Sequence, residues 1–202
     1  MTTEVLNDHH EHHDHHQEIA SKVTFGFWIY ILTDCIMFAS LFATYSVLHN
    51  NTYGSISIHD IVCLPYTLVQ TLILLVSTLT NGFMFSNILK RRPGHTMFWL
   101  GVTFILGILF FAMGMHEFID LIHKGYNWQG SAFLSSFFVL SATLYIHIIV
   151  GLLWMIILMI QLSMKNVTHT MKTRFTCFGL FWNYLNIIWV IIFTIVYLMG
   201  AI

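Results

Sequence analysis

The sequence predicts an all-α integral membrane protein, a bundle of five transmembrane helices. Only 8% of its 202 residues are charged and 57% are hydrophobic, whereas a soluble domain carries about 25% charged residues. The hydrophobic residues also form long runs, and the polar residues gather at the ends of these runs. A soluble enzyme, a nucleic-acid-binding protein and a secreted disulfide scaffold are therefore excluded.

Five segments are long enough to cross a bilayer as helices. A helix needs about 20 apolar residues to cross roughly 30 Å of hydrocarbon, and a helix satisfies its backbone hydrogen bonds within the segment. The predicted helices cover about 24–48, 65–89, 96–115, 134–162 and 175–198. Pro65 is suited to open the second helix, and the polar segment 90–94 predicts a tight turn before the third.

The segment before the first helix is predicted to be a disordered, His-rich cytoplasmic tail over residues 1–22, followed by a membrane domain over 23–202. Glu11 and Asp14 interrupt the histidines between His9 and His16, a composition that can bind Zn, Cu or Ni loosely. We expect no cleavable signal peptide, because the first twenty residues contain no apolar run.

Lysine and arginine in the loops predict the orientation, because cytoplasmic loops carry the excess of these residues. The predicted cytoplasmic side collects Lys22, Lys90, Arg91, Arg92, Lys165, Lys172 and Arg174, and the other side has Lys124. The N-terminus is therefore predicted to be cytoplasmic and the C-terminus periplasmic.

Small residues on the first helix predict a close contact with another helix. Ala39 and Ala43 are four residues apart, as are Ser40 and Thr44, and such pairs let helix backbones approach closely in a membrane.

Polar residues inside the predicted spans are candidates for function, because they are costly in lipid. These residues are Asp34, Gln70, His147, Asn183 and Asn186. Asn183 and Asn186 are expected on one face of the fifth helix, at a depth similar to that of Asp34. Two interpretations are open: a proton path, or hydrogen bonds that hold the helices together. The second is favoured because most of the set are amides, which do not relay protons by ionisation.

A second polar group lies at the outer end of the third helix. The spacing of His116, Asp120 and His123 makes them a weak candidate metal site, with Glu117 beside them. A polar helix end at the headgroups explains these residues as well. A haem needs axial ligands, typically histidine, and only His147 lies deep in a span, so the chain is predicted to hold no cofactor of its own.

The residues along the chain resemble subunit III of the haem-copper terminal oxidases, in particular its bacterial bo-type quinol oxidase branch. The run 25–35 (FGFWIYILTDC) is similar to the first-helix signature. Further matches are Leu64-Pro65, Glu117-Phe118, 130–135 (GSAFLS), His147, 151–154 (GLLW), Phe181-Trp182 and 196–201 (VYLMGA). The His-rich tail is also similar to that branch, and the resemblance covers nearly the whole chain.

The resemblance implies an accessory, non-catalytic subunit of a proton-pumping quinol oxidase, an oxidoreductase complex of the bacterial inner membrane that reduces O₂ to water in aerobic respiration. It implies haems and copper in subunit I, and oxidase subunits I, II and IV and membrane phospholipids as partners. No nucleic acid is expected. The role implied for the chain is to pack against subunit I and to support assembly and stability.

The sequence departs from this family at polar positions. Gln70 stands in place of a membrane-embedded glutamate, Leu144 and Tyr145 replace members of a His-Gly-x-His motif, Asn183 and Asn186 replace His and Asp, and Gly114 stands where Gln or Glu is common. Each change removes an ionisable or strongly polar group. We therefore expect the family's structure and partnership to hold here, but not its proton chemistry, with Asp34 and Glu117 as the main remaining acidic groups.

Three alternatives remain open at this point. The chain could belong to a short bacterial cytochrome c oxidase, because the choice of quinol as electron donor depends on the resemblance alone. It could be a small ion transporter that uses Asp34 and His147. It could also be a membrane enzyme built on His116, Glu117, Asp120 and His123.

Overall fold

All elements that the structure describes are helices. The computed structural model describes residues 2–48, 64–90, 92–125, 132–164 and 169–198, with side chains over 18–48, 65–90, 92–125, 132–164 and 170–197. The helices are α1 (Thr2–Leu48), α3 (Leu64–Leu89), α4 (Pro93–His123), α5 (Ala132–Met164) and α6 (His169–Ile192), which continues into a π-helical turn, η1 (Phe193–Leu198). Among the described residues, five helices are long and apolar enough to cross a membrane, which confirms the predicted all-α bundle of five helices.

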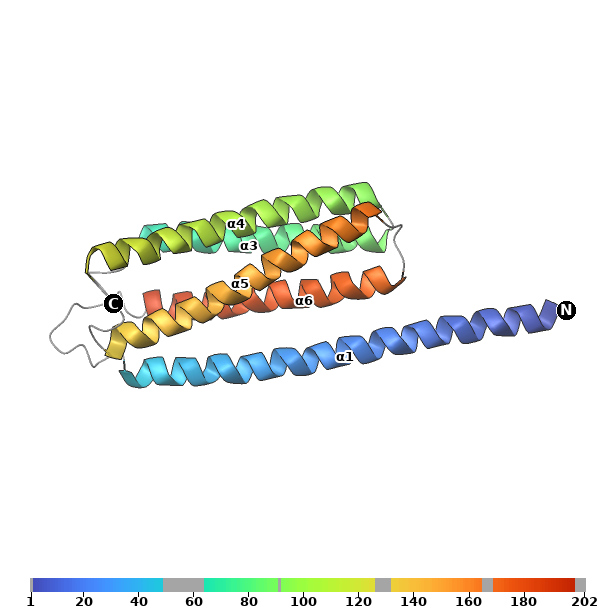
Figure 1. Ribbon diagram of the computed structural model, residues 1–202, viewed down its shortest axis with the longest axis horizontal. Coiled ribbons are helices and arrows are strands. Elements are labelled where there is room, and N and C mark those ends of the chain that lie inside the picture. The colour runs from blue at the N-terminus through green and yellow to red at the C-terminus, as the bar shows by residue number, and fades with distance from the viewer. Residues whose placement is uncertain (1, 49–63, 91, 126–131, 165–168, 199–202) are drawn as a thin grey trace.

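The structure differs from the sequence prediction at two helix ends. Helix α1 begins at Thr2, where a disordered tail was predicted over 1–22, and its first part extends beyond the other helices (Figure 1). No proline or glycine precedes Gly26, and extending an existing helix costs far less than starting one. Helix α4 continues to His123, eight residues beyond the predicted end at 115, so His116 and Glu117 are helical.

Some predicted features lie outside the described residues. They include Arg91, Lys165, residues 130 and 131 and the C-terminal residues 199–201, as well as the side chains of the histidines between 9 and 16.

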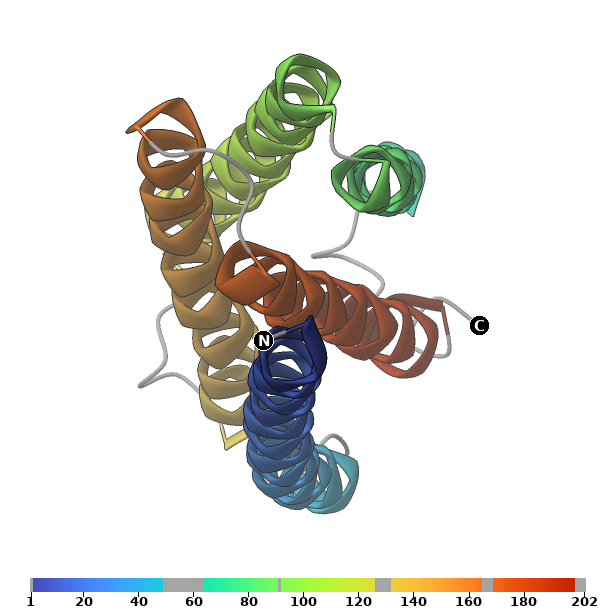
Figure 2. The same ribbon diagram turned by 90° about the vertical axis from the view of Figure 1, so that its right-hand side faces the viewer.

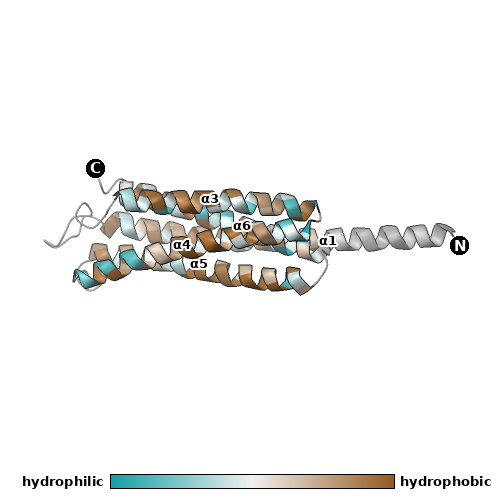
Figure 3. Cartoon of the chain, turned by 90° about the horizontal axis from the view of Figure 1, so that it is seen from above, coloured by the Kyte–Doolittle hydropathy of each residue, from teal (hydrophilic) through white to brown (hydrophobic). Residues whose placement is uncertain are grey.

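Helix α6 occupies the centre of the bundle. It packs against α1, α3 and α5, and α4 packs against α3 and α5. An end-on view places α1 and α3 on different sides of α6 (Figure 2). Hydrophobic residues predominate along the helices between their ends (Figure 3), and many of the large ones are exposed, as expected for a bundle that meets lipid or other transmembrane helices.

Two glycines make room for the largest side chain of this core. A Cβ atom at Gly107 on α4 or at Gly151 on α5 would lie 3.0 Å from the Trp182 ring. The absence of side chains at these positions lets α4 and α5 close onto the indole, which is almost fully buried. A side chain at either position would therefore press on the Trp182 ring.

Helix α1 attaches to the bundle along a single stripe. Its buried residues are Ile31, Asp34, Phe38 and Tyr45, spaced three, four and seven residues apart, as expected for one face of a helix. Phe38 packs edge-on against Tyr184 of α6, and Tyr45 lies 6.0 Å from Phe133 of α5 between ring centres.

The small residues of α1 do not form the helix contact that the sequence predicts. Ala39, Ser40, Ala43 and Thr44 are all exposed. Within the part of the chain that the structure describes, no other helix covers them, because the larger residues of the opposite face supply the contact with α5 and α6.

Candidate functional site

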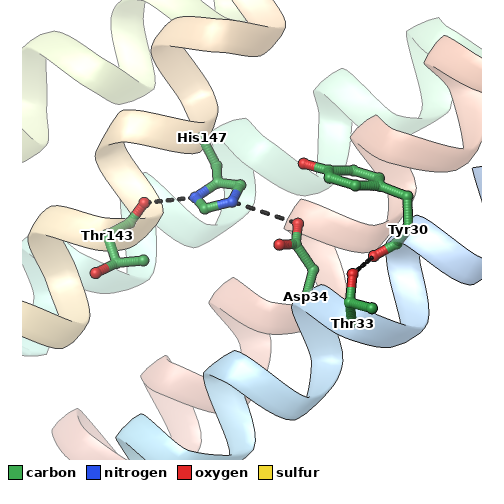
Figure 4. A network of polar contacts seen from close by, with 5 residues as sticks. All are labelled: Tyr30, Thr33, Asp34, Thr143 and His147. Carbon is green, nitrogen blue, oxygen red and sulfur yellow. Dashed lines mark hydrogen bonds and ion pairs between the residues drawn. The ribbon is translucent and has the colours of Figure 1, made fainter.

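Asp34 and His147 meet in the membrane between α1 and α5 (Figure 4). His147 Nε2 lies 3.3 Å from Asp34 Oδ2, and the two side chains are 16% and 11% exposed. The distance is that of an ion pair, although Asp34 Oδ2 makes no well-aligned hydrogen bond with the described residues. Phe38 and Phe181 lie on the imidazole, with ring centres 5.5 and 6.5 Å away.

The backbone determines where the His147 ring holds one of its protons. His147 Nδ1 lies 2.7 Å from the carbonyl oxygen of Thr143, and a carbonyl only accepts, so Nδ1 carries the hydrogen. Nε2 therefore faces Asp34 either as an acceptor from a neutral carboxyl group or as a donor to a carboxylate. In both arrangements the pair shares one proton and has no net charge, which makes it tolerable in a low-dielectric environment.

A second polar cluster surrounds Gln70, in the first part of α3. Gln70 Nε2 donates to the Phe110 carbonyl oxygen and to the Tyr145 hydroxyl oxygen, each at 3.4 Å. Glu117 of α4 points to the same region, within hydrogen-bonding reach of Tyr197. Gln70 Oε1 and Glu117 Oε2 are both buried and accept no hydrogen bond from the described residues.

Two departures from the family pattern, Gly114 and Tyr145, are explained by one contact in the structure. A Cβ atom at Gly114 would lie 2.2 Å from the Tyr145 hydroxyl oxygen. The space that a longer side chain at position 114 would occupy is therefore filled from α5 by Tyr145. The missing side chain at Gly114 and the large side chain at Tyr145 therefore compensate each other, and the Tyr145 hydroxyl accepts a hydrogen bond from Gln70.

A third set of polar contacts joins α3 to α6. Trp182 Nε1 donates to Ser77 Oγ at 3.1 Å, and Trp189 Nε1 donates to Thr71 Oγ1 at 3.0 Å. Between them, the Asn186 amide donates to the Leu74 carbonyl oxygen at 3.1 Å and to the Thr78 hydroxyl. Four hydrogen bonds from neighbouring turns of α6 thus link it to α3 across the hydrophobic core.

Sequence reasoning missed Thr71, Ser77 and Thr78. A usable signal is present: Thr71 and Thr78 share one face of α3, seven residues apart, and two tryptophans seven residues apart in α6 carry indole N–H groups that need acceptors when buried. The sequence does not show that these two faces meet.

The expected common face of Asn183 and Asn186 is not observed. Asn186 is buried against α3, whereas Asn183 is exposed. Three residues turn a helix by about 300°, which leaves the two side chains far enough apart to point to different surroundings.

The histidines at the outer end of α4 are not assembled into a ligand set. His116 and His123 are exposed, and Asp120 pairs with Lys124 at 3.8 Å. Over the described side chains, no group of three histidine, cysteine or acidic residues is placed to hold a metal ion.

The five long apolar helices and the buried polar contacts between them define a multi-pass membrane protein. The family model for cytochrome c oxidase subunit III matches residues 2–201. The chain belongs to this family, the haem-copper oxidase subunit III, and the resemblance found in the sequence is confirmed.

Individual relatives agree over most or all of their length. The chain is 47% identical to a cytochrome bo(3) ubiquinol oxidase subunit 3 from Pseudomonas aeruginosa, with 100% of both chains covered. It is 46% identical to the protein of the same name from Pseudomonas putida, over 87% of this chain and 85% of the relative. A cytochrome c oxidase subunit 3 from a Bacillus species is 34% identical, over 87% of this chain and 86% of the relative.

Proposed function

We propose that this chain is the accessory, cofactor-free subunit III of a proton-pumping quinol oxidase in a bacterial inner membrane. It packs against the subunit that holds the haems and copper, and it supports the assembly and stability of the complex. The full-length similarity to ubiquinol oxidase subunit 3 carries this proposal. Within this complex, oxidase subunits I, II and IV and membrane phospholipids surround the chain.

The polar contacts support a structural role for the intramembrane residues. A proton path needs a continuous series of groups that can give and take a proton. The contact of His147 on the side away from Asp34 is a backbone carbonyl, which cannot pass a proton on. We therefore assign Asp34 and His147 to joining α1 and α5 rather than to ion transport.

The positions of the basic residues support an orientation with a cytoplasmic N-terminus and a periplasmic C-terminus. Lys22, Lys90, Arg92, Lys172 and Arg174 lie near the helix ends from which the first part of α1 projects, and Lys124 lies at the opposite ends. A phosphatase that is active only in the periplasm, fused after Ile202, would be active in this orientation. Activity of the same reporter fused to the N-terminus instead would reverse it.

Purification in mild detergent from native membranes tests the main proposal. A tagged chain is expected to bring with it a large haem-bearing polypeptide and a strong haem absorption band, with quinol supporting O₂ consumption. A chain that binds haem after separation from all other polypeptides would contradict the accessory role. Oxidation of reduced cytochrome c in place of quinol would instead assign the complex to the cytochrome c oxidases.

A further inference from the structure

Asn183 is an exposed amide at the middle of a membrane span. The span of α6 and η1 runs from Thr170 to Tyr197, so Asn183 lies thirteen residues after its start and fourteen before its end. At 1.5 Å per residue it is about 20 Å from either end. An amide at this depth is costly unless it is hydrogen-bonded, because lipid tails offer no partner.

Five other outward-facing polar side chains of the spans form hydrogen bonds within their own helix. Thr33 donates to the Tyr30 carbonyl, Ser40 to Met37, Thr44 to Ser40, Asn87 to Phe83 and Thr194 to Val190, at distances of 2.7 to 2.9 Å. Asn183 differs, because its amide forms no hydrogen bond to any residue that the structure describes. Its partner therefore lies outside the described residues, and a neighbouring molecule at the same depth can supply one.

The contacts of α6 show which way Asn183 faces. Trp182, Asn186 and Trp189 point to α3, and Tyr184 packs against Phe38 of α1. Asn183 lies on the remaining side of the helix, which opens between α1 and α3 (Figure 2).

Exposed residues continue along this side of α6 as a stripe. Ile187, Val190 and Thr194 are exposed, with Ile187 at 61%, and with Asn183 they are spaced four, three and four residues apart. This spacing is that of a helix-packing seam, in which a single asparagine sets the register of the partner. We call these four residues the Asn183 stripe.

The residues flanking the stripe leave room for another helix. Cys35 of α1 interacts with Tyr184 of α6, and Ala39, one turn further along α1, is exposed. Gly82 of α3 lies one turn beyond Thr78, the partner of Asn186, and a Cβ atom there would meet nothing within 4 Å. Small residues at a helix contact allow backbones to approach closely in a membrane.

We propose that a transmembrane helix of the haem-bearing partner subunit packs on the Asn183 stripe, between α1 and α3, and presents a hydrogen-bonding side chain to Asn183. A lipid headgroup does not reach Asn183, because headgroups lie about 15 Å from the middle of the hydrocarbon layer and Asn183 lies near that middle. An acyl chain fills the space without supplying a donor or an acceptor. The existence of a haem-bearing partner rests on the proposed function. The new element is the face of this chain that binds the partner, namely the Asn183 stripe.

Photo-cross-linking in the whole complex, in native membranes, tests which molecule covers the stripe. Benzoylphenylalanine is introduced in place of Ile187 and, as a control, in place of Ile157 on the exposed face of α5. The expected product at position 187 is an adduct with the haem-bearing polypeptide, formed in clear excess over position 157. Adducts at 187 with lipid alone, with quinone or with a second copy of this chain overturn the proposal, as does the absence of any excess.

The contribution of the amide is measured with Asn183→Leu, and Asn87→Leu is the matched control because that amide bonds only to its own helix. Asn183→Leu is expected to reduce the retention of this chain with haem about threefold under washing in a stronger detergent, the effect of one interhelical hydrogen bond. Asn87→Leu is expected to leave retention unchanged. Equal retention in both variants overturns the role of Asn183. If the wild-type chain carries no haem-bearing partner, the proposed function is contradicted instead. Cross-linking at position 187 still identifies the molecule that covers the stripe in that case.

Discussion

Helices α1 and α6 pass through the same bundle but are held in it by different means. In the most hydrophobic 18 residues of each span, 56% are buried in α6 and 17% in α1. Helix α6 is joined to α3 by indole and amide hydrogen bonds in successive turns, whereas α1 has one stripe of rings and the Asp34–His147 contact. Helices α3 and α6 are therefore joined by more hydrogen bonds, and α1 is attached to the bundle through fewer buried residues.

Removal of the central indole is expected to have the largest effect. Trp182→Ala leaves a cavity between Gly107 and Gly151 and removes the donor to Ser77, so we expect a loss of about 3–5 kcal/mol in the free energy of unfolding. Unfolding of the purified complex in detergent, followed by tryptophan fluorescence and by release of this chain, measures it. Trp28→Ala on the exposed face of α1 is the control, and an equal loss in both variants would contradict the central role of α6.

Filling the space beside Tyr145 is expected to cost about 1–3 kcal/mol, the range for an overpacked core. Gly114→Ala places a Cβ atom against the Tyr145 ring and hydroxyl. Tyr145→Leu should be destabilising alone but should relieve part of the cost of Gly114→Ala, so a double-mutant cycle is expected to show favourable coupling. Gly101→Ala, where a Cβ atom meets nothing within 4 Å, serves as the control. Additive effects at 114 and 145 would show that the two residues are independent.

Breaking the Asp34–His147 contact between α1 and α5 is expected to cost about 1–2 kcal/mol. We expect the loss to show mainly as less of this chain assembled with the complex. Asp34→Leu leaves the His147 imidazole without its partner, whereas Asp34→Asn keeps a group that can donate to Nε2 and should cost less. The amount of this chain that co-purifies with haem is the measurement for assembly, and protons pumped per O₂ are measured on the assembled fraction. Normal assembly with lost pumping in Asp34→Asn would mean that Asp34 handles protons.

Removal of a single hydroxyl from the α3–α6 contacts is expected to have the smallest effect. Thr71→Val deletes the acceptor of the Trp189 indole and should cost about 0.6 kcal/mol, the average for interhelical hydrogen bonds in membranes. Thr33→Val, on the exposed face of α1, deletes a hydroxyl that bonds only to its own helix. The two variants should therefore differ in thermal stability, and identical stabilities would show that the indole bond adds nothing.

The number of helices and their positions in the chain could be predicted because both follow from local chemistry. Twenty apolar residues bounded by polar loops must cross the bilayer as a helix, whatever their neighbours. The predicted helix ends agree less well with the structure. Helix α4 continues through His116 to His123, because its polar residues do not terminate a helix and residues 116–123 contain no glycine or proline.

The polar residues inside the spans could be named from the sequence, but their partners could not. Asp34 and His147 are 113 positions apart, and Ser77 and Trp182 are 105 apart, so no spacing rule connects them. The small residues of α1 show the same limit: the pattern predicts a helix contact, but the described helices of this chain leave these residues exposed.

The sequence by itself determined that this chain is a five-helix membrane protein of the subunit III family, because hydrophobicity, span length and family motifs are properties of the residues alone. Only the tertiary structure decided how each polar group is satisfied: Asp34 by His147, Trp182 by Ser77, Asn186 by α3, and Asn183 by no described residue of the chain. The reason is physical. A three-residue step in a helix changes a side chain's direction by about 60°, and whether that direction meets a neighbour depends on how the helices pack.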